Sequence, residues 1–119
     1  KKKKKTFRDL KIWQQSMELV TEIYRATSSF PEEEKYGLTS QLRRSSVSIP
    51  SNISEGFGRN SQGDFKRFVN ISMGSLFELQ TQIEVARNLE FISKEIFENL
   101  YDHSREIERM MSSFIRTLK

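Results

Sequence analysis

The chain has little of what most catalytic and metal-binding sites require. Its 119 residues include no cysteine and one histidine, His103, which excludes disulfides, zinc–thiolate sites and cysteine nucleophiles. No His, Cys or carboxylate cluster has metal-ligand spacing, and no apolar run approaches the roughly 20 residues of a membrane-spanning helix. We therefore expect no metal, no cofactor, no membrane span and no catalytic residue. The lack of cysteine also fits a reducing, cytoplasmic environment.

The positive net charge belongs to one end of the chain. Residues 1–5 are all lysine and account for the whole net charge of +4, so the remainder is close to neutral. Charged termini are commonly flexible. We expect a basic, flexible tail over residues 1–6 and one domain over residues 7–119, the length of a single folding unit.

Apolar residues at steps of three and four predict four helices and no strands. The first helix is expected over residues 7–28, and the second from Pro31 or Glu32 to Gly56. Ser61 and Ser93 are suitable N-caps for the third and fourth, and Asn88 is a plausible left-handed stop between them. On the last helix the apolar seam passes through the following residues: Ile96, Leu100, His103, Ile107, Met110, Phe114 and Leu118. Short connections favour an all-α, antiparallel up-down-up-down four-helix bundle.

Two features inside these helices predict local irregularity. Pro50 lies within the second helix, where it removes a backbone donor and clashes with the preceding turn, so we expect a kink there. Gly74 and Ser75 interrupt the third helix at a cost of about 1 kcal/mol in helix propensity, which favours a close helix crossing at that point.

A polar motif on the second helix is the most specific local pattern. Read as a helix, steps of four, four, three and four place its members on one face. They are Arg44, Ser48, Asn52, Glu55 and Arg59. An arginine neighbour keeps a carboxylate charged, so a structural ion pair of Glu55 with Arg44 or Arg59 is favoured over acid–base chemistry.

The same region holds candidate contacts for nucleic-acid phosphates. They are Arg43, Arg44, Arg59, Lys66 and Arg67. Several lie near the start of the third helix, whose N-terminus favours anions, and Phe57 could stack on a base. A solvated positive patch without a ligand is the alternative interpretation.

The helices carry more apolar side chains than one buried stripe per helix requires. Ile12, Phe57, Phe77 and Val85 are the surplus. A second buried surface of this kind indicates contact between copies of the chain, so we expect a homo-oligomer.

Four segments resemble one protein family. They are F-R-D-L-K-I-W-Q from Phe7, F-P-x-x-E-x-Y-G-L-T-S-Q-L-R-R from Phe30, S-I-P-S-N-I-S-E-G-F-G-R from Ser48 and M-G-S-L-F-E-L from Met73. This pattern is similar to the four-helix-bundle family encoded in intervening sequences of bacterial 23S ribosomal RNA genes. Serine stands at positions 45 and 54, where the family favours alanine. The lysine run lies outside the resemblance.

The resemblance implies an antiparallel four-helix bundle and assembly into pentameric rings. The chain also looks like accessory proteins of diversity-generating retroelements, which use a basic surface to engage reverse transcriptase and nucleic acid. The family implies no settled activity and no catalytic residue.

Three hypotheses follow. The first is a non-enzymatic oligomeric bundle that binds RNA or a nucleoprotein partner. The second is a purely structural or protein-interaction module without nucleic-acid binding, in which the face of Arg44 and Glu55 is buried and ion-paired between helices or subunits. The third, an RNA-processing enzyme using His103 and Glu55, has the least support in the sequence.

Overall fold

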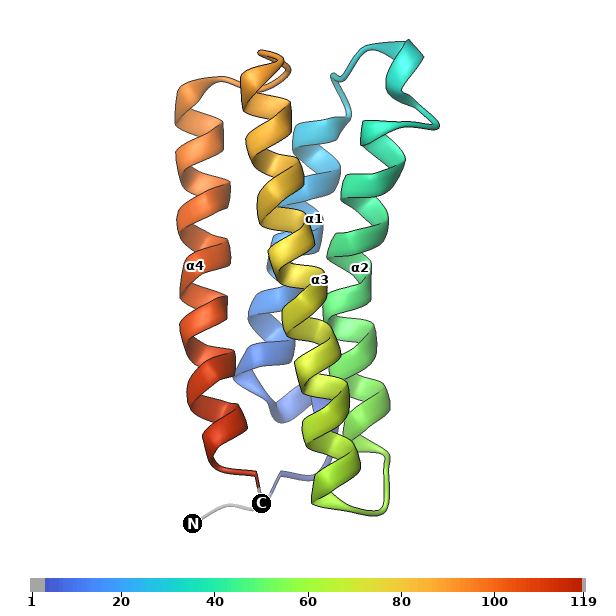
Figure 1. The fold of residues 1–119 in the computed structure, drawn as a ribbon, viewed down its shortest axis with the longest axis vertical. Helices are drawn as coiled ribbons and strands as arrows, with labels where there is room; N and C mark the ends of the chain where they lie inside the picture. Colours follow the sequence, from blue (N-terminus) through green and yellow to red (C-terminus); the bar gives the residue numbers. More distant parts are fainter. Residues whose placement is uncertain (1–3, 119) are drawn as a thin grey trace.

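Four α-helices make up the computed structural model, which describes residues 4–118. They are α1 (Lys11–Thr27), α2 (Leu38–Phe57), α3 (Gln62–Asn88) and α4 (Lys94–Arg116). Two single 3-10 turns, η1 (Phe7–Asp9) and η2 (Glu32–Glu34), precede α1 and α2, and no strand occurs among the described residues. The all-α four-helix prediction is confirmed. In Figure 1 the helices lie along the long axis of the molecule, and each one runs opposite to the one before it.

The first predicted helix is divided at Leu10. The Asp9 carboxylate accepts hydrogen bonds from the backbone N–H groups of Lys5 and Thr6, and the Thr6 hydroxyl accepts from Arg8. These local bonds close η1, and buried Leu10 then takes an extended conformation before α1 begins. Helix periodicity continued through this point, so the sequence did not reveal the break. Part of the predicted tail over residues 1–6 lies outside the described residues.

The second helix starts later than predicted, at Leu38 instead of Pro31 or Glu32. The N-terminus of α2 is capped by the Glu34 carboxylate, which accepts a hydrogen bond from the backbone N–H of Leu38 at 3.0 Å. Gly37 has non-helical backbone angles and separates η2 from α2. Glu34 therefore caps α2 from outside the helix.

The predicted caps of α3 and α4 are confirmed. The Ser61 hydroxyl accepts from the backbone N–H of Asp64, and that of Ser93 accepts from Ile96, both at 3.1 Å. α3 ends at Asn88 as expected. The left-handed residue, however, is Glu90, with φ of 63°.

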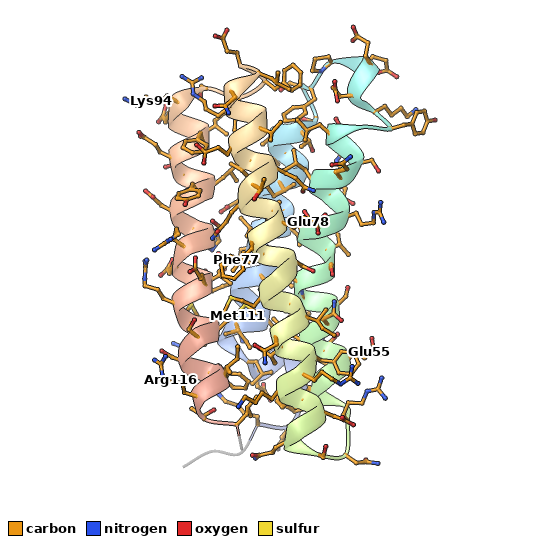
Figure 2. All side chains as sticks on the ribbon, viewed as in Figure 1. Glu55, Phe77, Glu78, Lys94, Met111 and Arg116 are labelled. Carbon is orange, nitrogen blue, oxygen red and sulfur yellow. The ribbon has the colours of Figure 1, made fainter. Side chains whose placement is uncertain are left out.

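The core runs the length of the bundle between all four helices. Its fully buried side chains include the following: Leu19, Ile23, Ile49, Ile53, Leu76, Leu79, Ile83, Ile107 and Met111. On α4 the buried line is Leu100, Ser104, Ile107 and Met111, so Met111 replaces the predicted Met110 (Figure 2). The predicted starting point of that seam, Ile96, is 41% exposed.

Helices α2 and α3 approach closely at small residues. A Cβ atom at Gly56 would lie 2.7 Å from the Cβ of Phe68, so only glycine fits there. At the crossing predicted for Gly74 and Ser75, Gly74 does not make the contact, because a Cβ at that position would meet nothing within 4 Å. Its neighbour Ser75 does face α2. α2 is continuous across buried Pro50, and the kink stays a prediction.

Candidate nucleic-acid interface

One residue of the predicted polar motif, Ser48, ties α2 to α3. The Asn52 amide donates to the backbone carbonyl of Ser48 at 2.9 Å and to its hydroxyl at 3.0 Å. That hydroxyl lies 2.8 Å from the Oγ of Ser75 on α3. Ser48 therefore links the two helices, and the Asn52 amide holds the Ser48 hydroxyl from within α2.

Glu55 pairs with Arg59, not with Arg44. The Arg59 guanidinium lies 3.0 Å from the Glu55 carboxylate, and both side chains are about half exposed. Arg44 precedes Glu55 by eleven residues, about 16 Å along the helix axis, which is too far for a direct bond. Arg44 is exposed and forms no ion pair with any residue in 4–118.

A buried hydrogen-bond chain lies behind Arg44. Ser45 donates to the side-chain carbonyl of Gln82 at 2.7 Å, and the Gln82 amide donates to Glu78 at 3.3 Å. Farther along, Ser72 donates to the backbone carbonyl of Ile49 at 2.6 Å. A small polar cleft of about 270 Å³ opens outside this chain. Its lining residues are Gln41, Arg44, Ser45, Ser48, Ser75 and Glu78.

Arg43 connects α2 to α1. Its Nε donates to the Thr27 hydroxyl at 2.9 Å, and its Nη2 donates to the Tyr24 carbonyl at 3.4 Å. The guanidinium carbon also lies 4.4 Å from the centre of the Tyr24 ring, in cation–π contact. These contacts fix the position of Arg43 before any ligand arrives.

A larger cleft of about 510 Å³, which we call the tyrosine cleft, opens between α1 and the start of α2. Its lining residues are Tyr24, Lys35, Tyr36, Thr39, Ser40, Arg43, Arg44 and Val47. None of these is acidic, and Arg44 lines both this cleft and the smaller polar one. Sequence reasoning missed Lys35 and Tyr36 because the second helix was expected to include them.

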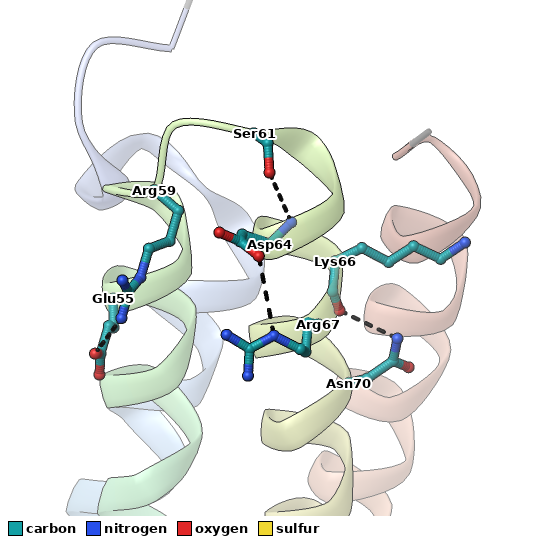
Figure 3. A network of polar contacts seen from close by, with 7 residues as sticks. All are labelled: Glu55, Arg59, Ser61, Asp64, Lys66, Arg67 and Asn70. Carbon is teal, nitrogen blue, oxygen red and sulfur yellow. Dashed lines mark hydrogen bonds and ion pairs between the residues drawn. The ribbon is translucent and has the colours of Figure 1, made fainter.

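Arg59 and Arg67 converge on a second position, at the α2–α3 turn. Their guanidinium carbons lie 4.7 and 4.8 Å from the centre of the Phe68 ring. Arg67 also lies 4.0 Å from the Asp64 carboxylate (Figure 3). Figure 3 shows Lys66 reaching away from Arg59, toward α4. The five predicted cations thus divide into the pair on α2, the pair at Phe68, and Lys66 alone.

His103 is a structural bridge between α4 and α1. Its Nδ1 lies 2.9 Å from Glu22 and its Nε2 lies 2.9 Å from the Gln15 side-chain oxygen. A carboxylate only accepts hydrogen bonds, so Nδ1 donates to Glu22. Both ring nitrogens are therefore engaged by α1. Among residues 4–118, no group of His, Asp and Glu side chains could hold a metal ion, and no helix is long and apolar enough to cross a membrane.

Comparisons with known proteins agree with this architecture. A similar solved structure is a protein with unknown function from the S23 ribosomal protein family of Bacteroides thetaiotaomicron. It is 27% identical, with a TM-score of 0.79, and the match covers 87% of this chain and 97% of the other. No curated protein matches. The similarity to retroelement accessory proteins stays a prediction.

The family comparison covers most of the chain. Residues 8–113 match the model of the 23S rRNA-intervening sequence protein family, a span that includes all of α1, α2 and α3 and most of α4. It also includes the tyrosine cleft and the cations at Phe68. The chain therefore belongs to the 23S rRNA-intervening sequence protein family.

Proposed function

We propose that this protein is a non-enzymatic helical bundle that binds RNA through the exposed side of α2. One observation carries the proposal. From Lys35 to Ser54 the chain contains Lys35, Arg43 and Arg44 but no aspartate or glutamate. This segment is a stretch of single-sign charge on a nearly neutral domain, and such a surface attracts polyanions.

The surroundings of these cations support a phosphate ligand. Arg44 is exposed and has no carboxylate partner among the described residues, and Arg43 is held in place by neutral groups. Ser40 and Ser51 are exposed on the same helix, and short side chains of this kind let a nucleic-acid backbone approach closely. Guanidinium groups bind phosphate oxygens through paired N–H donors.

The names of related proteins favour RNA over DNA. The family is described by 23S rRNA intervening sequences, and the similar solved structure is assigned to a ribosomal protein family. Histidine is the usual general base of a small RNA-cleaving site. Both ring nitrogens of His103 are already hydrogen-bonded to α1, which favours binding without catalysis.

A salt series tests the proposal. Affinity for a structured RNA is measured by fluorescence anisotropy at increasing salt, with Arg44→Ala beside the wild type. Each phosphate contact contributes about −0.7 to −0.9 to the slope of log affinity against log salt, so the variant should have a shallower slope. Lys94→Ala, on α4 and far from α2 in Figure 2, removes the same charge and is the control. No binding at low salt, or an equal effect of Lys94→Ala, contradicts the proposal.

The alternative, a protein-interaction module, has its own supporting observation. The outer side of α3 exposes Ile71, Phe77 and Val85 by 42%, 46% and 38%. Gly74 lies between them with open space above it. An apolar stripe of this kind suits contact with another copy of the chain. Association would also repeat the α2 cations and raise RNA affinity through multivalency, so the two functions are compatible.

Light scattering separates these possibilities. Phe77→Glu should reduce the mass in solution if α3 is a contact between copies. Asn99→Glu on α4 introduces the same charge at an exposed position and should leave the mass unchanged. A monomeric wild-type protein would remove the self-association proposal and leave RNA binding to be judged on the salt series alone.

A further inference from the structure

The tyrosine cleft has the composition of a site for one unpaired nucleotide. We propose that it binds a single-stranded segment of RNA, with a base stacked on Tyr36 and the adjoining phosphate held by Arg43 and Arg44. This inference rests on the proposed function and specifies which form of RNA the α2 side binds.

Tyr36 is the platform for the base. Its side chain is 88% exposed, by far the largest value among the exposed large hydrophobic residues. The neighbouring segments are ordered, because Glu34 caps α2 and the backbone N–H of Gly37 donates to the carbonyl of Glu34 at 2.9 Å. The backbone that carries the exposed ring is therefore held in place next to the cleft. The Lys35 ammonium lies over one face of the ring, 5.6 Å from its centre, which leaves the other face for a base.

Arg43 and Arg44 supply the phosphate contacts. Two of the five N–H donors of the Arg43 guanidinium are used by Thr27 and Tyr24. The others have no acceptor among residues 4–118. Because its contacts already fix this side chain, it loses little freedom when it binds a phosphate. Arg44, one residue later, also lines the cleft and adds a second cation.

The size and the charge of the cleft agree with this ligand. Its volume of about 510 Å³ is within the range of small-molecule sites. The hydroxyls of Thr39 and Ser40 line the wall, where they can contact ribose or base edges. No carboxylate among the lining residues would repel a phosphate.

The combination of aromatic and cationic groups favours a single strand over a duplex. Bases in a helix are stacked on one another and cannot reach a protein ring, whereas unpaired bases stack readily on aromatic side chains. A duplex would use the cations alone. Tyr36 would then contribute nothing to its binding.

Two probes and two variants test the proposal. The probes are a single-stranded oligouridine and a fully paired RNA duplex of equal length, and the readout is anisotropy at constant salt. Tyr36→Ala should weaken binding of the single strand about 5- to 150-fold, the range measured for loss of one stacking contact. Duplex binding should hardly change. Tyr36→Phe keeps the ring and should retain the single-strand affinity.

Several results would overturn the inference, and they differ from failure of the proposed function. If the wild type binds RNA but Tyr36→Ala binds the single strand equally well, the nucleotide site is wrong and RNA binding by the α2 side stands. If the wild type binds neither probe, both proposals fail. A lower mass of Tyr36→Ala in light scattering would make the cleft an interface between copies. Equal competition by an acidic peptide of matched charge would make it a protein site.

Discussion

The α2–α3 contact and the α1–α4 contact solve the same packing problem with different side chains. Between α2 and α3, glycine and serines let the backbones approach, and hydroxyls donate across the gap, as Ser72 does to Ile49. Between α1 and α4 the polar link is the larger side chain of His103, held by Gln15 and Glu22. At one end, that second contact leaves an open and mainly apolar cleft of about 540 Å³, lined by residues that include Leu10, Ile12 and Phe114.

This difference explains where the candidate interface lies. Small residues complete the side of α2 that faces α3 with short hydrogen bonds, and Arg43 packs on α1, so Arg44 is not needed for either contact. Arg44 remains exposed for that reason. Around α4 the charges of both signs are mixed along the helix, and Arg105 lies 3.6 Å from Glu108. The two halves therefore differ in surface charge as well as in packing.

The largest effect should come from closing the α2–α3 approach with a bulky residue. Gly56→Val places a Cβ only 2.7 Å from the Cβ of Phe68 and adds two methyl groups. Overpacking of this kind costs about 1–3 kcal/mol and at times more. Urea denaturation measures the loss. Gly74→Ala is the control, and it should gain up to about 1 kcal/mol from helix propensity because space is open there.

Removal of the α1–α4 bridge should have the next largest effect. His103→Ala leaves Glu22 and Gln15 without their partner in a half-buried position, which costs about 1–3 kcal/mol. The free energy of unfolding is the measurement. An unchanged free energy of unfolding would mean that α4 is held by its buried apolar residues alone. The α1–α4 contact would then not depend on a polar link.

Two buried serines sharpen the comparison on a smaller scale. Ser72 and Ser104 are both fully buried on helices, but Ser72 donates across to α2, whereas Ser104 donates to Tyr101 within α4. Ser72→Ala should cost about 1 kcal/mol, the usual net value of a hydrogen bond. Ser104→Ala should cost less, because its bond joins no other helix. Equal losses of unfolding free energy in the two variants would contradict a stabilising role for the Ser72 hydrogen bond between α3 and α2.

The smallest effect is expected at the exposed ion pair. Glu55→Ala removes the bond to Arg59, and exposed pairs are worth about 0–1 kcal/mol. Unfolding of the protomer should hardly change. If the same variant reduces the mass seen in light scattering, Glu55 is buried between copies, and the structural-module hypothesis is favoured.

Local patterns predicted much of this structure. The Ser61 and Ser93 caps follow from serine placed directly before a periodic run, where its hydroxyl accepts a helical N–H. Apolar residues at steps of three and four predicted the four helices in the same local way, although on α1 the buried line is Ile12, Leu19 and Ile23. These features depend only on neighbours in the sequence.

The remaining features depend on contacts between residues that are distant in sequence, or on a side chain that accepts a hydrogen bond from a backbone N–H in place of a carbonyl. Glu34 moved the start of α2 by capping it from outside the helix, and this placed Lys35 and Tyr36 in an exposed turn. The position of Arg43 depends on Thr27 of α1. Helical periodicity put Arg44 and Glu55 on one face, but their separation of eleven residues already placed them too far apart to pair directly. The tyrosine cleft was therefore not visible in the sequence.

The affinity of Arg44→Glu for a structured RNA at low salt is the most direct test of the claim that the α2 side is a binding surface and not a packing surface. The account predicts a large loss of affinity together with an unfolding free energy within about 0.5 kcal/mol of wild type, as is usual for exposed positions. Unchanged RNA affinity in a fully folded Arg44→Glu protein would contradict it.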